Sequence, residues 1–212
     1  FFHANTVYNS YEKHISAPLL RHLFEKKPGK AQISVIGLGF YRLFLNGKDI
    51  TKGELAPYIS NPDHYVYVDE YDVTDLLNDG ENVVGLILGN GMQNTDNAYW
   101  EFRDNVFRSA PKFAFSLEID GEEIFDAGSF VWTESPYYYD DLRSGVFYDA
   151  TKEIDNWCSP SFDDSLWLSV TEGERVRGKI RKKVSPCVNV YEEVEPLWVK
   201  PSDLDPIYVD NG

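Results

Sequence analysis

The sequence predicts an all-β fold, a sandwich or a barrel, from three observations. Short apolar runs alternate with turn residues along most of the 212 residues. Two dipeptides, Asn46-Gly47 and Asp120-Gly121, have the composition of tight hairpin turns, in which both central residues take positive φ. Helix signals are few. Many short strands with regular turns and little helix are typical of sandwiches and barrels.

Strand candidates follow one another through the first half of the chain. Residues 82–88 are apolar enough for a sheet that is buried on both faces. Residues 18–24 fit a helix or a strand, and their position before the first hairpin favours a strand. Asp72 or Thr74 is expected to cap a short turn that runs through Leu77. The other strands predicted here are residues 33–36, 41–45, 48–50 and 65–68.

The second half continues the same pattern as far as about residue 170. Residues 112–119 alternate apolar and polar side chains, as a strand with one buried face does. Asp120-Gly121 then turns the chain into a strand at residues 122–125. Residues 130–132 close the series.

Composition narrows the possible partners. The chain has 20 Lys and Arg against 35 Asp and Glu, a net charge of −15. This balance argues against duplex nucleic acid and anionic membranes, which select basic surfaces. No apolar run approaches the roughly 20 residues that span a bilayer, so a soluble protein is expected. Cys158 and Cys187 could form one bridge or none, and no cluster has the spacing of a metal site.

A basic run at residues 174–183 interrupts this acidic background. It could indicate nucleic acid, but a solvated strand or linker is favoured, because no aromatic residue lies between its cations in the sequence. Its cations are Arg175, Arg177, Lys179, Arg181, Lys182 and Lys183.

The two ends of the chain suggest an excised piece of a longer protein. The chain opens at Phe1 without an initiator methionine or an apolar leader. It closes at Gly212, just after a strand-like run at residues 206–209 that needs a sheet neighbour.

Three clusters of residues stand out by their order and spacing. The first is IGLGFYRLFLNGK at residues 36–48. The second is YDVTDLL at 71–77 with GENVVGLILGNG at 80–91. The third runs from GVFYDA at 145–150 through Trp157 and FDDS at 162–165 to Trp167. Together they resemble the N-terminal accessory region of bacterial α-L-rhamnosidases, glycoside hydrolase family 78. The resemblance covers roughly residues 17–212.

The resemblance implies a domain division and a fold. Residues 1–16 are an N-terminal extension, and residues 17–170 are a jelly-roll, galactose-binding-like β-sandwich. Residues 171–212 are a linker and the first strands of a second β-sandwich domain. The parent protein is then an inverting α-L-rhamnosidase whose catalytic carboxylates lie on a downstream helical barrel. That catalytic domain is the expected partner of this region.

The motif residues have structural roles that require no catalysis. Asn46 and Gly47 set the hairpin register, and Asp72 and Thr74 bond the local backbone between strands. Four further residues are expected to clamp a crossover onto one face of the sandwich: Trp157, Asp163, Asp164 and Trp167. Two positions depart from the family pattern, Met92 in place of an aromatic residue and Thr151 in place of an arginine.

We predict no catalytic residue in this chain. An inverting pair needs an acid and a base about 6.5–9.5 Å apart. The carboxylate doublets here, such as Asp140-Asp141 and Asp163-Asp164, are sequence neighbours, and neighbours on a strand point to opposite faces.

Sugar binding is the alternative to a purely structural role. Sugars dock on aromatic faces that are surrounded by polar groups, and the segment 90–109 and the tyrosines at 137–139 offer both. The candidate carbohydrate-binding residues are Asn94, Asp96, Tyr99, Trp100 and Tyr138. The competing interpretation is that these aromatics pack against the missing catalytic barrel.

A calcium ion could assist such binding. Some relatives hold L-rhamnose on this kind of domain with calcium, which needs hard oxygen ligands. The metal candidates are Asp63 and Asp96, with Asn61, Asn94 and Asn97 near them in sequence. No cofactor is expected to be required.

Overall fold

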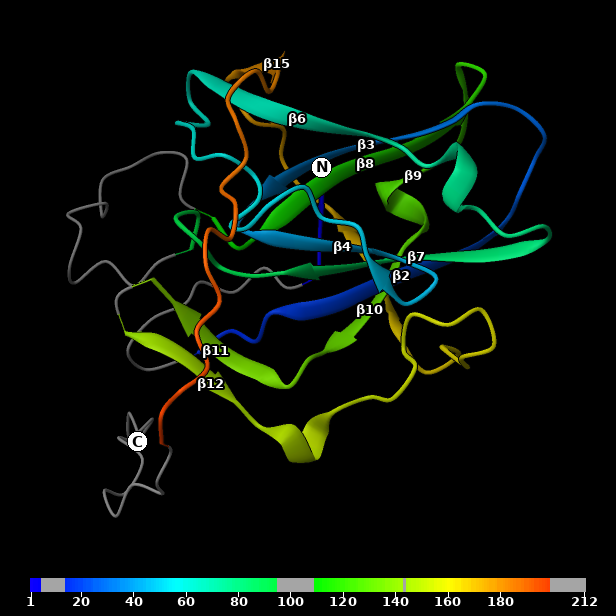
Figure 1. Ribbon diagram of the computed structural model, residues 1–212. Helices are drawn as coiled ribbons and strands as arrows, with labels where there is room; N and C mark the ends of the chain where they lie inside the picture. The colour runs from blue at the N-terminus through cyan, green and yellow to red at the C-terminus, as the bar shows by residue number, and fades with distance from the viewer. Residues whose placement is uncertain (5–13, 95–108, 143, 199–212) are drawn as a thin grey trace.

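The structure is a computed structural model that describes residues 1–4, 14–94, 109–142 and 144–198. Two sheets pack face to face and a small hairpin lies beside them (Figure 1). The first sheet has seven strands, in the order β14-β1-β8-β3-β6-β15, with β9 paired to β8. Its strands are β1 (Phe2–His3), β3 (Ala31–Leu38), β6 (Tyr65–Asp72), β8 (Lys112–Ile119), β9 (Glu122–Asp126), β14 (Thr171–Glu172) and β15 (Lys179–Lys182).

The second sheet has six strands, in the order β13-β10-β2-β7-β4-β5. The hairpin of β11 (Tyr137–Asp141) and β12 (Gly145–Tyr148) forms a separate two-stranded sheet. The strands of the second sheet are β2 (Pro18–Glu25), β4 (Tyr41–Leu45), β5 (Lys48–Asp49), β7 (Glu81–Leu88), β10 (Val131–Glu134) and β13 (Leu168–Ser169).

The prediction of an all-β fold is confirmed. Residues 18–24 lie within strand β2, which pairs with both β7 and β10. In the described residues, helix is limited to three short 3-10 turns, η1 (Thr74–Leu76), η4 (Ala127–Ser129) and η5 (Ala150–Lys152). None of the described helices is long and apolar enough to cross a membrane.

One hydrophobic core fills the space between the sheets. In strand β7, Val83, Val84 and Leu86 are all fully buried, as expected of a strand that is covered on both faces. In β8 every second residue is buried, so only one of its faces points into the core. Other fully buried members of this core are Leu20, Ile33, Val35, Leu43, Leu88, Phe113 and Leu117.

Asparagine side chains hold the first hairpin against the neighbouring strand. Asn46 and Gly47 both have positive φ, 52° and 81°, as the turn between β4 and β5 requires. The Asn46 amide oxygen accepts from the Val83 amide at 2.9 Å, and its amide nitrogen donates to the Asn82 side chain at 2.8 Å. The turn residue therefore also sets the register of β4 beside β7.

The 72–74 turn is bonded to strand β3. The Asp72 carboxylate accepts from the Thr74 amide at 3.2 Å and from the Thr74 hydroxyl at 2.7 Å. The same hydroxyl oxygen accepts from the Ala31 amide at 3.0 Å. These bonds hold the pKa of the Asp72 carboxyl below its ordinary value.

A crossover at residues 153–170 packs on the outer face of the second sheet. Its two tryptophans, Trp157 and Trp167, are stacked with centroids 6.5 Å apart. Arg21 of β2 reaches into the crossover, where it is 1% exposed, pairs with Asp164 and donates to the Ser159 carbonyl at 3.0 Å. The Asp163 carboxylate accepts from the Ser165 amide at 3.0 Å.

The chain after residue 170 returns to the first sheet. Strand β14 pairs with β1, and β15 pairs in parallel with β6 as an edge strand (Figure 1). Residues 183–198 contain no strand, although Glu54 and Val188 form an isolated bridge. Cys158 is buried and Cys187 is half-buried, and both are free thiols. The boundary expected near residue 170, and the second domain, stay predictions.

Candidate functional site

Two glycine motifs that lie far apart in the sequence meet at one end of the sandwich. The Gly89 amide donates to the Phe40 carbonyl at 2.7 Å. Gly39 has φ +118°, and a Cβ there would lie 2.1 Å from the Gly89 carbonyl oxygen. Only glycine fits where two backbones approach this closely. The turn between β3 and β4 and the end of β7 therefore form one rigid corner.

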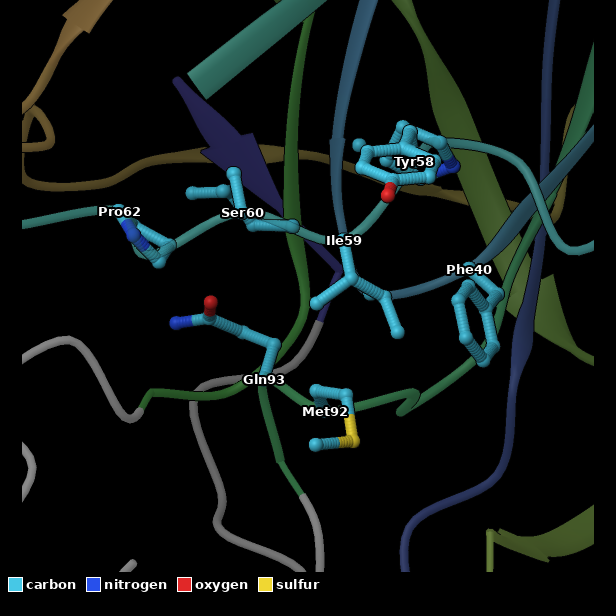
Figure 2. Close-up of a pocket in the computed structure, with 11 residues that line it drawn as sticks. Phe40, Tyr58, Ile59, Ser60, Pro62, Met92 and Gln93 are labelled. Atoms are coloured by element: carbon cyan, nitrogen blue, oxygen red, sulfur yellow. The ribbon is translucent and has the colours of Figure 1, made fainter. Parts of the chain in front are cut away.

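A hollow opens beside this corner. It is bounded by the corner itself, by the loop at residues 57–62 and by the residues after β7 (Figure 2). The side chains of Ile59 and Met92 point toward one another across it, with Phe40 at one end and Gln93 near Pro62 at the other. A larger hollow of about 310 Å³ adjoins it and shares Phe40, Tyr58 and Ile59. Both are lined mainly by apolar and aromatic side chains.

In the loop at residues 54–62, the sequence indicates a site role for Asn61 alone, two residues before the metal candidate Asp63. The large apolar side chains of this loop are nevertheless exposed to solvent: Leu55 is 58% exposed, Tyr58 48% and Ile59 55%. The sequence signal for this surface is the pair of large apolar side chains between Pro57 and Pro62. Exposed loops rarely carry several such residues together, so a group of them indicates a contact surface.

The predicted sugar-binding residues do not form one group in the described chain. Asn94 is fully buried, and its side-chain amide nitrogen donates to the Asn90 side-chain oxygen at 2.8 Å. Tyr138 is 38% exposed on β11, with the Lys152 ammonium 5.8 Å from its ring. Asp96, Tyr99 and Trp100 lie outside the described residues. The proposed sugar contacts stay predictions.

The calcium candidates stay predictions as well. The Asp63 amide donates to the Asn61 side chain at 3.0 Å, so these residues form a local turn. Within the residues described, His, Cys, Asp and Glu nowhere gather in threes in a way that could hold a metal ion. The neighbouring Pro62 does share the smaller hollow with Gln93, so the segments around Asp63 and Asn94 lie on the same end of the sandwich.

A buried polar link connects this end of the sandwich to the β11–β12 hairpin. The Asp140 carboxylate accepts from the Asn90 amide at 2.7 Å and also from the Asn90 side chain. The Asn90 side chain also donates to the Ile15 carbonyl at 3.1 Å. Burial raises the pKa of Asp140 to about 6, and the donors on Asn90 offset part of that rise.

A second polar cluster includes Lys183, which also lines the larger hollow. The Tyr41 hydroxyl donates to the buried Asp69 carboxylate at 2.7 Å and lies 2.9 Å from the Tyr71 hydroxyl. The Lys183 ammonium is 3.7 Å from Asp69 and 3.6 Å from the Cys187 sulfur. Burial raises the pKa values of both tyrosines, so both hydroxyls stay protonated near neutral pH. This cluster attaches the chain after β15 to the core.

This architecture defines the class of protein as a β-sandwich domain with a hollow at one end. The profile of the family described as "Alpha-L-rhamnosidase N-terminal domain" matches residues 26–192. The chain belongs to this family.

Curated relatives are similar over most of this chain. An α-L-rhamnosidase of Formosa agariphila is 33% identical over 180 residues, which cover 81% of this chain and 19% of the relative. One of Streptomyces avermitilis is 31% identical and covers 84% of this chain and 18% of the relative. The chain thus spans about a fifth of the length of these relatives.

Solved structures agree with the fold. The α-L-rhamnosidase of Dictyoglumus thermophilum superposes with a TM-score of 0.72 at 31% identity, over 84% of this chain and 20% of that one. The enzyme of Aspergillus terreus, at 20% identity, has a TM-score of 0.73 over 85% of this chain and 21% of that one, which supports the fold alone.

Proposed function

We propose that this chain is the non-catalytic N-terminal β-sandwich of an α-L-rhamnosidase, an inverting hydrolase that removes terminal α-L-rhamnose from glycosides. In this role the sandwich braces the catalytic domain that follows it and borders the substrate cleft.

The observation that carries the brace is the apolar surface of residues 184–198. Tyr191 and Leu197 are 98% and 99% exposed, and large apolar side chains so fully in water call for a covering partner. The segment comes last in the described chain, so a following domain is suitably placed to cover it. Its other exposed apolar residues are Val184, Val188, Val190, Val194 and Trp198.

The state of Asp140 supports a non-catalytic role. A glycosidase general acid needs a carboxyl whose pKa is raised and whose oxygens face the substrate. Asp140 has the raised pKa, about 6, but both its oxygens accept hydrogen bonds from Asn90. Its carboxyl group therefore holds the hairpin in place and is not directed at a ligand.

The brace is tested in the full-length protein with Leu197→Asp. We expect a lower melting temperature for the catalytic domain, because a charge is placed in a buried interface. Leu166→Asp is the matched control, since Leu166 is 93% exposed and lies in the crossover, on a different side of the molecule (Figure 1). Equal melting temperatures for the two variants would contradict the brace.

Turnover of an aryl α-L-rhamnoside by residues 1–212 alone would contradict the non-catalytic assignment.

A carbohydrate-binding module for L-rhamnose or a related sugar is the second candidate function. The hollow at Phe40, Tyr58 and Ile59 favours it, since sugar sites combine aromatic faces with a few polar groups. The structure of the 28% identical Streptomyces avermitilis enzyme is described as complexed with L-rhamnose.

A calorimetric titration with L-rhamnose, with and without calcium, tests this function. Binding of L-rhamnose that is weakened by Tyr58→Ala or Trp100→Ala would establish a carbohydrate-binding module. Loss of that binding when a chelator removes calcium would show that calcium is required. A flat titration of the folded protein would leave the brace alone.

A further inference from the structure

Three tyrosines form a continuous aromatic surface beside the edge of the seven-stranded sheet. Tyr65 and Tyr67 of β6 have ring centroids 5.4 Å apart, and Tyr58 of the 54–62 loop lies 6.0 Å from Tyr67. Tyr58 is exposed and the other two are half-buried. All three therefore keep part of their surface in contact with solvent.

Two cations share this face of the sheet. The edge strand β15 lies beside β6 (Figure 1), with Lys179 opposite Tyr65 and Arg181 opposite Tyr67. Alternate residues of a strand point to the same face, so Lys179 and Arg181 lie on the side of the tyrosines. The Arg181 guanidinium is 4.8 Å from the Tyr65 ring centroid, within cation–π distance.

These two cations differ from the next two of the basic run, Lys182 and Lys183, because no carboxylate pairs with them. Lys182, on the other face of β15, pairs with Glu70 at 2.8 Å, and Lys183 lies 3.7 Å from Asp69. Lys179 and Arg181 make no ion pair with any residue in the described part of the chain. Both are exposed, in a chain whose net charge is −15. Uncompensated cations in such a chain suit an anionic ligand.

This face combines the guanidinium of Arg181, which offers several N–H donors, with aromatic rings. A guanidinium binds a carboxylate through two parallel hydrogen bonds, and the apolar faces of pyranose rings pack on aromatic side chains. Tyr58 also lines the hollow of about 310 Å³, so the aromatic surface continues into it. We propose that Tyr58, Tyr65, Tyr67, Lys179 and Arg181 form a binding surface for an oligosaccharide that carries a uronic acid. The carboxylate lies at Arg181 and the neighbouring sugar rings lie on the tyrosines.

The geometry favours an acidic oligosaccharide over single-stranded nucleic acid. Tyr65 and Tyr58 are tilted by 70° and 69° from the plane of Tyr67, so successive bases cannot stack on them in parallel. A ligand with a phosphate at every residue would also be repelled by the net charge of −15. A uronate surrounded by neutral sugars carries a single charge to the two cations.

The test is a calorimetric titration of the protein with glucuronosyl-xylotriose, which joins a single uronic acid to neutral xylose residues. Its methyl ester is the matched neutral ligand, and octathymidylate is the nucleic-acid probe. We expect saturable binding of the acid only. Arg181→Gln should weaken it about tenfold or more, since a bidentate charged contact is lost. Lys182→Gln, which removes a cation from the opposite face, should change it less than about twofold.

The proposal is overturned by any of four results, the last of them from the variant Tyr67→Leu. The first is no saturable binding of glucuronosyl-xylotriose, or equal binding of its ester. The second is an equal loss in the Arg181 and Lys182 variants, which would indicate only a general charge effect. The third is tighter binding of octathymidylate. Tyr67→Leu, checked for folding by circular dichroism, should also weaken binding, and an unchanged affinity would exclude the aromatic surface. None of these outcomes depends on whether the sandwich braces a catalytic domain.

Discussion

At the scale of single residues, Arg21 links strand β2 to the crossover. It is a charged side chain at 1% exposure, and it reaches the crossover from the middle of β2. A buried charge is tolerated only when its partners are supplied, and here the crossover supplies Asp164 and two carbonyl oxygens. These contacts of Arg21 therefore hold the crossover in position on the second sheet.

We predict that Arg21→Met lowers the free energy of unfolding by about 2–4 kcal/mol, because Asp164 and the carbonyl groups lose their buried donor. Urea denaturation measures the change. Arg42→Met is the control, since Arg42 is half exposed and pairs with Asp49 and Glu54 at the surface. It should cost less than about 1 kcal/mol. Similar losses in both variants would show that the buried pair has no special role.

Asp140 makes the stability of the folded protein depend on pH. Its pKa is about 6 when folded, against an ordinary value of 3.8. Between these values the folded protein holds a proton that the unfolded chain has released. Stability from this residue is therefore highest below about pH 4 and declines as the pH rises to about 6.

We predict that Asp140→Asn removes this decline. The difference in free energy of unfolding between the two proteins should change by about 2–3 kcal/mol from pH 4 to pH 7 and then stay level. Urea titrations across this range measure it. A difference that is constant with pH would mean that Asp140 titrates normally in the folded protein.

At the scale of elements, the contact between the β3–β4 turn and the end of β7 determines where the hollow forms. Gly39 and Gly145 both have positive φ, +118° and +100°. They differ in their surroundings, because a Cβ at Gly39 would meet the Gly89 carbonyl and one at Gly145 would meet nothing within 4 Å.

We predict that Gly145→Ala costs about 1 kcal/mol, the backbone penalty alone, and that Gly39→Ala costs about 3 kcal/mol or more. Thermal and urea unfolding of the two variants provide the comparison. If the two losses were equal, the close approach of the two turns would not be required.

At the scale of the whole molecule, net charge is the dominant electrostatic feature. A charge of −15 on a chain of 212 residues opposes compaction through self-repulsion. We predict that adding sodium chloride from low to physiological ionic strength raises the melting temperature by a few degrees, since screening reduces this repulsion. Differential scanning calorimetry measures the shift, and a concentration series of an uncharged osmolyte separates it from general solute effects. A fall in melting temperature would show that attractive ion pairs outweigh the repulsion.

Local sequence patterns were sufficient for the β content and the general position of most strands. Turns such as Asn46-Gly47 depend on the φ preferences of two adjacent residues, and the burial of residues 82–88 depends on their own side chains. The family resemblance likewise rested on motifs of contiguous residues. Such features can be predicted because their causes lie within a few residues of one another.

The hollow and the tyrosine surface required the folded chain. Arg181 is more than 100 residues from Tyr58 and Tyr67 in the sequence, and no aromatic residue lies among the cations of residues 174–183. The parallel pairing of β15 with β6 brings the cations to the tyrosines, and the packing of the 54–62 loop adds Tyr58. Asn94, a candidate by residue type, is instead buried against Asn90. Long-range pairing selects which side chains meet, and no short-range pattern records that choice.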